Sequence, residues 1–165
     1  MKILGRNLIL TLAIACLCIW ATWASSPSMA DMSPLPSTMI QLPSQFSVSE
    51  TGDRFEEALQ QRQLNLFARI DHAQNAASVG KELRATQLLI FGNPNVGTPL
   101  MQCNQTVAID LPQKALIWQD ASDQVWFAYN DPEYLMERHS LTGCESVIER
   151  ISGVLNELAI AATGA

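Results

Sequence analysis

The chain has 165 residues, a formal net charge of −6 and a hydrophobic content of 48%, which suits one domain with an appended segment. Acidic residues outnumber basic ones by 16 to 10, and the basic residues form no run, so nucleic acid is not expected as a partner. The sequence contains no CxxC or HExxH motif, which removes the commonest zinc signatures and indicates no particular cofactor or metal.

The first 30 residues have the three-part plan of a secretory signal peptide. Lys2 and Arg6 form a basic start, Leu8–Ala24 is uncharged and mostly apolar, and small residues follow. We expect cleavage after Ala30, with cleavage after Ala24 as the alternative. A retained anchor is the other interpretation, although the apolar run is at the short limit for crossing a bilayer. The anchor would then be the protein's only contact with a membrane.

Cleavage changes what the mature chain carries. Removing Lys2 and Arg6 leaves 10 − 2 = 8 basic residues against 16 acidic ones, a net charge of −8. The mature protein would be exported, to a periplasm, a lumen or the exterior. Cys103 and Cys144 would be its remaining cysteines, and an even pair in an oxidising compartment suggests a disulfide.

Residues 31–44 are rich in proline and serine and predict a linker, so the domain is expected to span residues 45–165. The alternation around Phe46 and Val48 predicts a short strand, and Phe55 and Leu59 lie on the apolar face of a helix that follows. In the next predicted strand, residues 64–70, we expect Leu64, Leu66, Ala68 and Ile70 to face the core.

Further strands are expected at residues 86–91, 115–119 and 124–130, the last two forming a hairpin. Asp131, Pro132 and Glu133 predict the start of a helix that runs to about His139. A long amphipathic helix follows from about Glu145. This order of elements predicts an α+β fold in which helices cover one side of an antiparallel sheet.

The stretch Leu88–Met101 reads LLIFGNPNVGTPLM and is the best site candidate in the chain. Its apolar half predicts a buried strand, and its second half predicts a shaped loop at the strand's carboxyl end. The glycines and prolines could form a backbone nest that binds an anion, or only a tight turn. The loop lacks the lysine of a P-loop, so nucleotide binding has weak support.

His72 follows Asp71 at the end of a predicted strand and is the main candidate for acid–base chemistry. It could be a general base or a ligand, or it could simply bond to a backbone carbonyl. An enzyme would use His72 and Asp110 as acid–base groups. A soft-metal or haem site would use His72 and Met101, with Cys103 nearby in sequence.

Four segments together resemble the domain of unknown function 302 family over about residues 46–139: LNLFARIDHAQNAASVG, LRATQLLIFGNPNVGTPLMQ, AIDLPQKALIWQD and VWFAYNDPEYLMERH. The resemblance implies a TATA-binding-protein-like α+β fold, with a strand, a helix, four strands and a helix, and it implies a homodimer. This chain departs from the family pattern at Ala85, where proline is usual, and at Gln113, where leucine is common.

We therefore expect an exported, non-catalytic module that binds or senses an unidentified small molecule. No nucleophile, base and orienting group can be assembled from the sequence. The enzyme and the soft-metal or haem binder are therefore the second and third hypotheses. Asp110 is expected near the pocket, and the ligand-binding candidates are His72, Gly92, Asn93, Gly97, Thr98, Met101 and Tyr129.

Overall fold

The computed structural model describes residues 38–165, so the predicted signal peptide and residues 31–37 of the predicted linker lie outside the described residues. The described elements, in chain order, are β1 (Met39–Ser44), α1 (Val48–Gln61), β2 (Asn65–Asp71), α2 (His72–Ser78), β3 (Thr86–Gly92), α3 (Pro94–Cys103), the 3₁₀ helix η1 (Gln105–Ile109), β4 (Gln113–Gln119), β5 (Val125–Asn130), α4 (Pro132–His139) and α5 (Glu145–Thr163).

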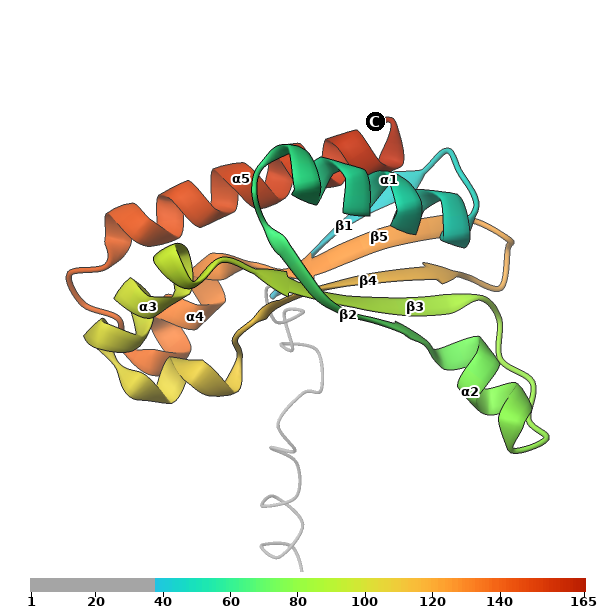
Figure 1. Cartoon of the computed structure of the whole chain (residues 1–165), viewed down its shortest axis with the longest axis horizontal. Coiled ribbons are helices and arrows are strands. Elements are labelled where there is room, and N and C mark those ends of the chain that lie inside the picture. The colour runs from blue at the N-terminus through green and yellow to red at the C-terminus, as the bar shows by residue number, and fades with distance from the viewer. Residues whose placement is uncertain (1–37) are drawn as a thin grey trace, which may run out of the picture. The chain divides into compact units, whose positions relative to one another are not determined.

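The five strands form one antiparallel sheet in the order β1-β5-β4-β3-β2. Helices α1 and α5 lie side by side on one face of this sheet (Figure 1). Phe55 of α1 packs edge-on against Phe91 of β3, with 5.0 Å between ring centroids, and Leu155 and Leu158 of α5 are buried in the same core. The predicted α+β fold, with helices covering one side of an antiparallel sheet, is confirmed.

The start of the folded region differs from the expectation. Met39–Ser44, placed in the predicted linker, form edge strand β1 and pair with β5. Pro43 is compatible with this position because an edge strand leaves some N–H positions unpaired. The alternation around Phe46 does not make a strand either. Ser47 caps α1 by accepting a hydrogen bond from the Glu50 backbone N–H at 3.2 Å, so the helix begins at Val48.

A β-bulge at Phe67 reverses the alternation of side chains along β2. The pairing register shifts between Leu66 and Ala68, so that Leu66 lies opposite Phe91 and Arg69 lies opposite the buried Leu89. Directly paired residues of antiparallel strands point to the same face, so Arg69 faces α1. The expectation that Ala68 and Ile70 share the core face with Leu66 is therefore wrong.

Arg69 uses this position to connect β2 to α1. Its guanidinium donates to the Ser49 carbonyl oxygen at 3.0 Å and to Gln87 Oε1 at 3.0 Å, and it pairs with Asp53. The guanidinium also occupies the space beside Gly52, where an added Cβ would lie 2.6 Å from Arg69 Nη2. A glycine at this point of α1 thus allows the arginine to pass under the helix.

Candidate functional site

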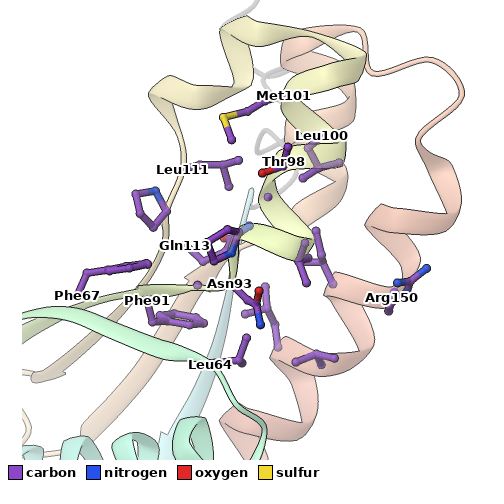
Figure 2. A pocket seen from close by; sticks show the side chains of 18 of the residues that line it. Leu64, Phe67, Phe91, Asn93, Thr98, Leu100, Met101, Leu111, Gln113 and Arg150 are labelled. Atoms are coloured by element: carbon purple, nitrogen blue, oxygen red, sulfur yellow. The ribbon is translucent and has the colours of Figure 1, made fainter.

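A pocket of about 590 Å³ lies at the end of the sheet where β3 ends and β4 begins. Its walls come from α3, α5, the bulge of β2 and the segment that leads into β4 (Figure 2). Most of the side chains around it are apolar. The lining residues are Arg62, Leu64, Phe67, Phe91, Gly92, Asn93, Pro94, Val96, Gly97, Thr98, Leu100, Met101, Ala108, Leu111, Pro112, Gln113, Arg150, Ile151, Val154 and Leu155.

The segment predicted as a shaped loop is instead helix α3. Asn93 caps this helix, because its Oδ1 accepts a hydrogen bond from the Asn95 backbone N–H at 2.9 Å. Pro94 occupies the first turn, where a missing N–H leaves no bond unmade. The Asn93 side chain also donates to the Gln63 carbonyl oxygen at 3.2 Å, which fixes the start of α3 beside the end of α1. The run of turn residues is therefore a helix start and not a free anion nest.

Two glycines set the shape of the pocket wall. A Cβ added at Gly92 would lie 3.6 Å from Phe67 Cε2 and 3.7 Å from Pro112 Cβ. A Cβ added at Gly97 would lie 3.7 Å from Leu111 Cδ1. These are ordinary contact distances between pocket-lining groups, so any larger side chain at either position would occupy the pocket itself.

One polar atom in the pocket wall has no partner. Gln113 Nε2 is buried and makes no hydrogen bond, and it is the only such side-chain nitrogen or oxygen among residues 38–165. Gln113 begins β4 opposite Phe91, and its side chain is among those that line the pocket (Figure 2). Leaving a buried amide donor unpaired costs about 1–3 kcal/mol.

The charged groups of the pocket lie on exposed parts of its lining. Arg62 pairs with Glu157 at 2.6 Å, and both side chains are substantially exposed. Arg150, on α5, is exposed and points away from the other lining side chains in Figure 2. The interior of the pocket thus contains no charged group.

Five of the predicted ligand-binding residues come together at this pocket: Gly92, Asn93, Gly97, Thr98 and Met101. Sequence reasoning missed Phe67, Gln113 and the lining residues of α5. The bulge that brings Phe67 to the pocket left no recognisable pattern. A signal did exist for Gln113, because this position departs from the family pattern.

His72 and Tyr129 lie elsewhere. His72 begins α2 next to Asp71, and Asp71 pairs with Gln87 at the end of β2 that lies farthest from Gly92. Hydrogen bonding from the Gln74 backbone N–H lowers the pKa of Asp71, which caps α2. Tyr129 lies on β5 and is buried in the core of the domain, and this burial raises the pKa of its hydroxyl.

The expected combinations of His72 with Asp110 and with Met101 are therefore not assembled. Asp110 lies just before β4, and Met101 lines the pocket, both at the opposite end of the sheet from His72. Within residues 38–165, no group of three or more His, Cys, Asp and Glu side chains is arranged to hold a metal ion.

Asp110 instead contacts the other histidine of the sequence. His139 is buried at the end of α4, and its Nε2 lies 2.6 Å from Asp110 Oδ2. Its Nδ1 lies 3.0 Å from Thr106 Oγ1, and its carbonyl oxygen accepts from Asn104 Nδ2 at 2.8 Å. Arg138 adds an ion pair to Asp110 at 3.4 Å. We call Asn104, Thr106, Asp110, Arg138 and His139 the Asp110–His139 cluster.

This cluster joins η1 to α4 and is not part of the pocket. None of its five residues lines the pocket. The Thr106 hydroxyl also bonds to Asn104 Oδ1 at 2.9 Å, so the hydroxyl is held inside the cluster. A hydroxyl, a histidine and a carboxylate in a row are typical of nucleophilic catalysis, but none of these three side chains lines the pocket.

Cys103 and Cys144 lie side by side at the end of α3 and the start of α5. Their sulfur atoms are in contact, and their Cα atoms are 6.6 Å apart, within the range that a disulfide spans. The two cysteines thus join the helix that forms one wall of the pocket to the helix that forms the other.

Curated proteins that are named as ion channels share a segment with this chain. The chain is 43% identical over 115 residues to proteins named "Fluoride-specific ion channel FluC 1" from Brucella suis and "Fluoride-specific ion channel FluC 2" from Brucella melitensis. The match covers 70% of this chain but only 44% and 42% of those proteins, so the chain spans less than half the length of these relatives. None of the helices described between residues 38 and 165 has the length and apolar character needed to span a bilayer.

A solved structure shares the fold. The crystal structure of an uncharacterised conserved DUF302 protein from Bacillus stearothermophilus superposes with a TM-score of 0.70 at 16% identity. It covers 76% of this chain and 98% of its own chain. The family described as "Domain of unknown function DUF302" matches residues 40–158, which include every strand of the sheet except the first residue of β1. The chain therefore belongs to the DUF302 family.

Proposed function

We propose that this DUF302 domain is a non-catalytic module that binds a small apolar organic molecule in the pocket between α3 and α5. The observation that carries the proposal is the pocket itself. Its volume of about 590 Å³ is typical of small-molecule sites, and its lining is mainly aliphatic and aromatic. Binding would remove the exposed parts of these side chains from water, at about 25 cal/mol for each Å² of apolar area.

The chemistry of the lining supports binding over catalysis. Its twenty residues include no histidine, carboxylate, lysine or cysteine, and Thr98 supplies the lining's hydroxyl group. A nucleophile needs a base within hydrogen-bond reach, and the pocket offers none. His139 and Asp110 contact each other in the Asp110–His139 cluster, and neither side chain lines the pocket.

The channel activity in the relatives' name is not carried over to this chain. The chain corresponds to less than half of each relative, and its described residues include no helix able to span a membrane. Within this proposal, the shared segment contributes ligand binding or sensing.

Export and dimerisation belong to the same proposal. The N-terminal residues have the composition of a cleaved signal peptide, and the family resemblance implies a dimer. Sequencing of the mature N-terminus should begin at Asp31, and an intact Met1 would contradict export with cleavage. Sedimentation equilibrium of the mature protein should give twice the mass of one chain, and a single-chain mass would contradict the dimer.

Binding can be tested with N-phenyl-1-naphthylamine, whose fluorescence rises in apolar surroundings. Wild-type protein should bind this probe saturably. Gly97→Leu should weaken binding at least about tenfold, because the new side chain points from α3 toward Leu111 and fills the pocket.

Gly153→Leu is the matched control. It places the same side chain on α5, where an added Cβ meets nothing within 4 Å, so probe binding should equal that of wild type. Val154→Phe fills the pocket from its other wall and replaces Gly97→Leu if that variant unfolds in a thermal melt. Absence of saturable binding by wild type, or wild-type binding by the filled variants, would overturn the proposal.

A further inference from the structure

The charged residues of the pocket lining are both positive, and both are exposed at its mouth. They are Arg62 and Arg150, and the other eighteen lining residues are uncharged. Acidic residues outnumber basic ones in the chain by 16 to 10, yet none of them lines the pocket. The sign of the charge at this site is therefore opposite to that of the whole chain, which favours a ligand with a negative end.

The inside of the pocket offers little to the polar part of a ligand. Asn93 uses Oδ1 to cap α3 and Nδ2 to bond to Gln63. Gln113 Nε2 is buried in the wall, out of reach of a ligand atom. A polar group placed among the aliphatic and aromatic side chains would thus lose its water without gaining a partner, whereas at the mouth it stays partly hydrated. The lining therefore suits a molecule with an apolar body and a polar end that remains at the mouth.

Arg150 is the arginine that is available at the mouth. Its side chain makes no hydrogen bond or ion pair within residues 38–165, while Arg62 is paired with Glu157 at 2.6 Å. In Figure 2 the Arg150 side chain extends away from the other lining residues. A long, exposed arginine side chain can turn toward the mouth, and here the turn would break no existing bond.

The position of Arg150 on α5 relates it to the apolar wall. The lining residues of this helix are Arg150, Ile151, Val154 and Leu155, which lie on one face because they are separated by one, four and five positions. Arg150 stands at one end of this stripe, and the rest of the stripe is aliphatic. A hydrocarbon chain lying along the aliphatic part would bring its end group to Arg150.

We infer that the pocket binds amphiphilic organic anions, with a single hydrocarbon chain among the apolar side chains and a carboxylate at the mouth beside Arg150. This inference rests on the proposed binding function, and it adds the class of ligand and the residue that selects its charged end.

A matched pair of ligands isolates the charged end. Decanoate and decan-1-ol carry hydrocarbon chains of similar length and differ in the charge of the head group. Each is titrated as a competitor of N-phenyl-1-naphthylamine, and the ratio of the two dissociation constants is compared between wild type and Arg150→Met. Methionine removes the charge, and its effects on the hydrocarbon chain cancel in the ratio.

The ratio should shift about fivefold against decanoate in Arg150→Met, because an exposed ion pair contributes up to about this factor. Arg84→Met makes the same replacement at an exposed arginine that does not line the pocket, so the ratio should equal that of wild type. Arg150→Gln repeats the test if the methionine variant does not fold. Raising the ionic strength should shift the wild-type ratio in the same direction, since salt screens exposed charges.

The length of the hydrocarbon chain tests the other half of the inference. Decanoate should bind about tenfold more tightly than octanoate, because two further methylene groups are removed from water. Gly97→Leu should reduce this difference, since it fills the pocket.

The outcomes separate the inference from the proposed function. If wild type binds the fluorescent probe but the ratio is the same in Arg150→Met, or if octanoate binds as tightly as decanoate, the inference is wrong and the pocket function stands without it. If wild type does not bind the fluorescent probe, the binding function itself is wrong.

Discussion

The pocket and the Asp110–His139 cluster lie close together in the chain and use their polar groups in opposite ways. In the cluster, the buried His139 has both ring nitrogens within hydrogen-bond distance of a partner. In the pocket wall, the buried Nε2 of Gln113 has none. The side chains best suited to acid–base chemistry are thus hydrogen-bonded to one another, while one buried donor beside the pocket has no partner. The difference teaches that a cluster of reactive side chains can serve the stability of the fold, while the cavity able to admit a ligand is lined mainly by apolar groups.

The largest effect is expected at Cys103 and Cys144, which join the two helices that form the walls of the pocket. If these residues form a disulfide, the bridge closes a separation of 41 residues, and Cys103→Ser should lower the free energy of unfolding by about 3–4 kcal/mol. Denaturant unfolding under oxidising conditions measures this loss. Cys144→Ser should give the same loss, and the double variant should add little. Two free thiols at these positions in the folded, exported protein would contradict the pairing.

In the cluster, Asp110→Ala should lower the free energy of unfolding by about 2–4 kcal/mol, because it leaves the buried His139 without its acceptor. Urea unfolding measures the change. The dissociation constant of N-phenyl-1-naphthylamine should stay at the wild-type value, since Asp110 does not line the pocket. Loss of probe binding with unchanged stability would reverse the roles assigned to the two regions.

In the pocket wall, Gln113→Met should not lower the free energy of unfolding as Asp110→Ala does. Replacing an unpaired buried amide with an apolar side chain of similar length should leave the free energy of unfolding unchanged or raise it by up to about 1 kcal/mol. Thermal melts beside Asp110→Ala provide the comparison. A clear loss of stability would show that the Gln113 amide has a partner within the folded protein.

The smallest effect concerns another carboxylate with several hydrogen-bond partners, that of Asp120 in the hairpin between β4 and β5. Hydrogen bonds from Ser122 and the Trp126 indole lower the pKa of Asp120 from 3.8 to about 2. Because the folded pKa lies below the unfolded one, ionised Asp120 stabilises the fold above about pH 4, and this contribution is lost as the pH falls toward 2. The NMR shift of the Trp126 indole N–H should titrate with a midpoint near 2. Asp120→Asn should abolish this titration. A midpoint near 4 would show that the hydrogen bonds to Asp120 do not lower its pKa.

Local patterns were sufficient for most of the fold. The hairpin of β4 and β5 and the apolar face of α5 follow from periodicity, and the start of α4 follows from Asp131 and Pro132, as observed. β1 was missed because a short edge strand containing Pro43 has the composition of a linker. Helix α5 begins at Glu145 as expected, with Cys144 as its N-cap, and the Glu145 side chain accepts a hydrogen bond from the Gly143 backbone N–H at 2.9 Å.

The site was predictable only where it is local in sequence. Gly92, Asn93, Gly97, Thr98 and Met101 belong to one continuous stretch, so a single motif located them. The partner of Asp110 is 29 residues away, and no spacing rule distinguishes His139 from His72 across such a distance. The missed contributions of β2, β4 and α5 depend on tertiary packing, which determines whether a donor such as that of Gln113 is buried and unpaired.

The bulge in β2 has a consequence for how this domain can change over evolution. One additional residue places Phe67 at the pocket and, two positions later, turns Arg69 toward α1. Deleting one residue there would change both at once. Every side chain on one side of the deletion along β2 would then point to the opposite face of the sheet. Substitutions can therefore adjust the pocket gradually, whereas a single-codon deletion in β2 would remove an aromatic wall and the attachment of a helix in the same step.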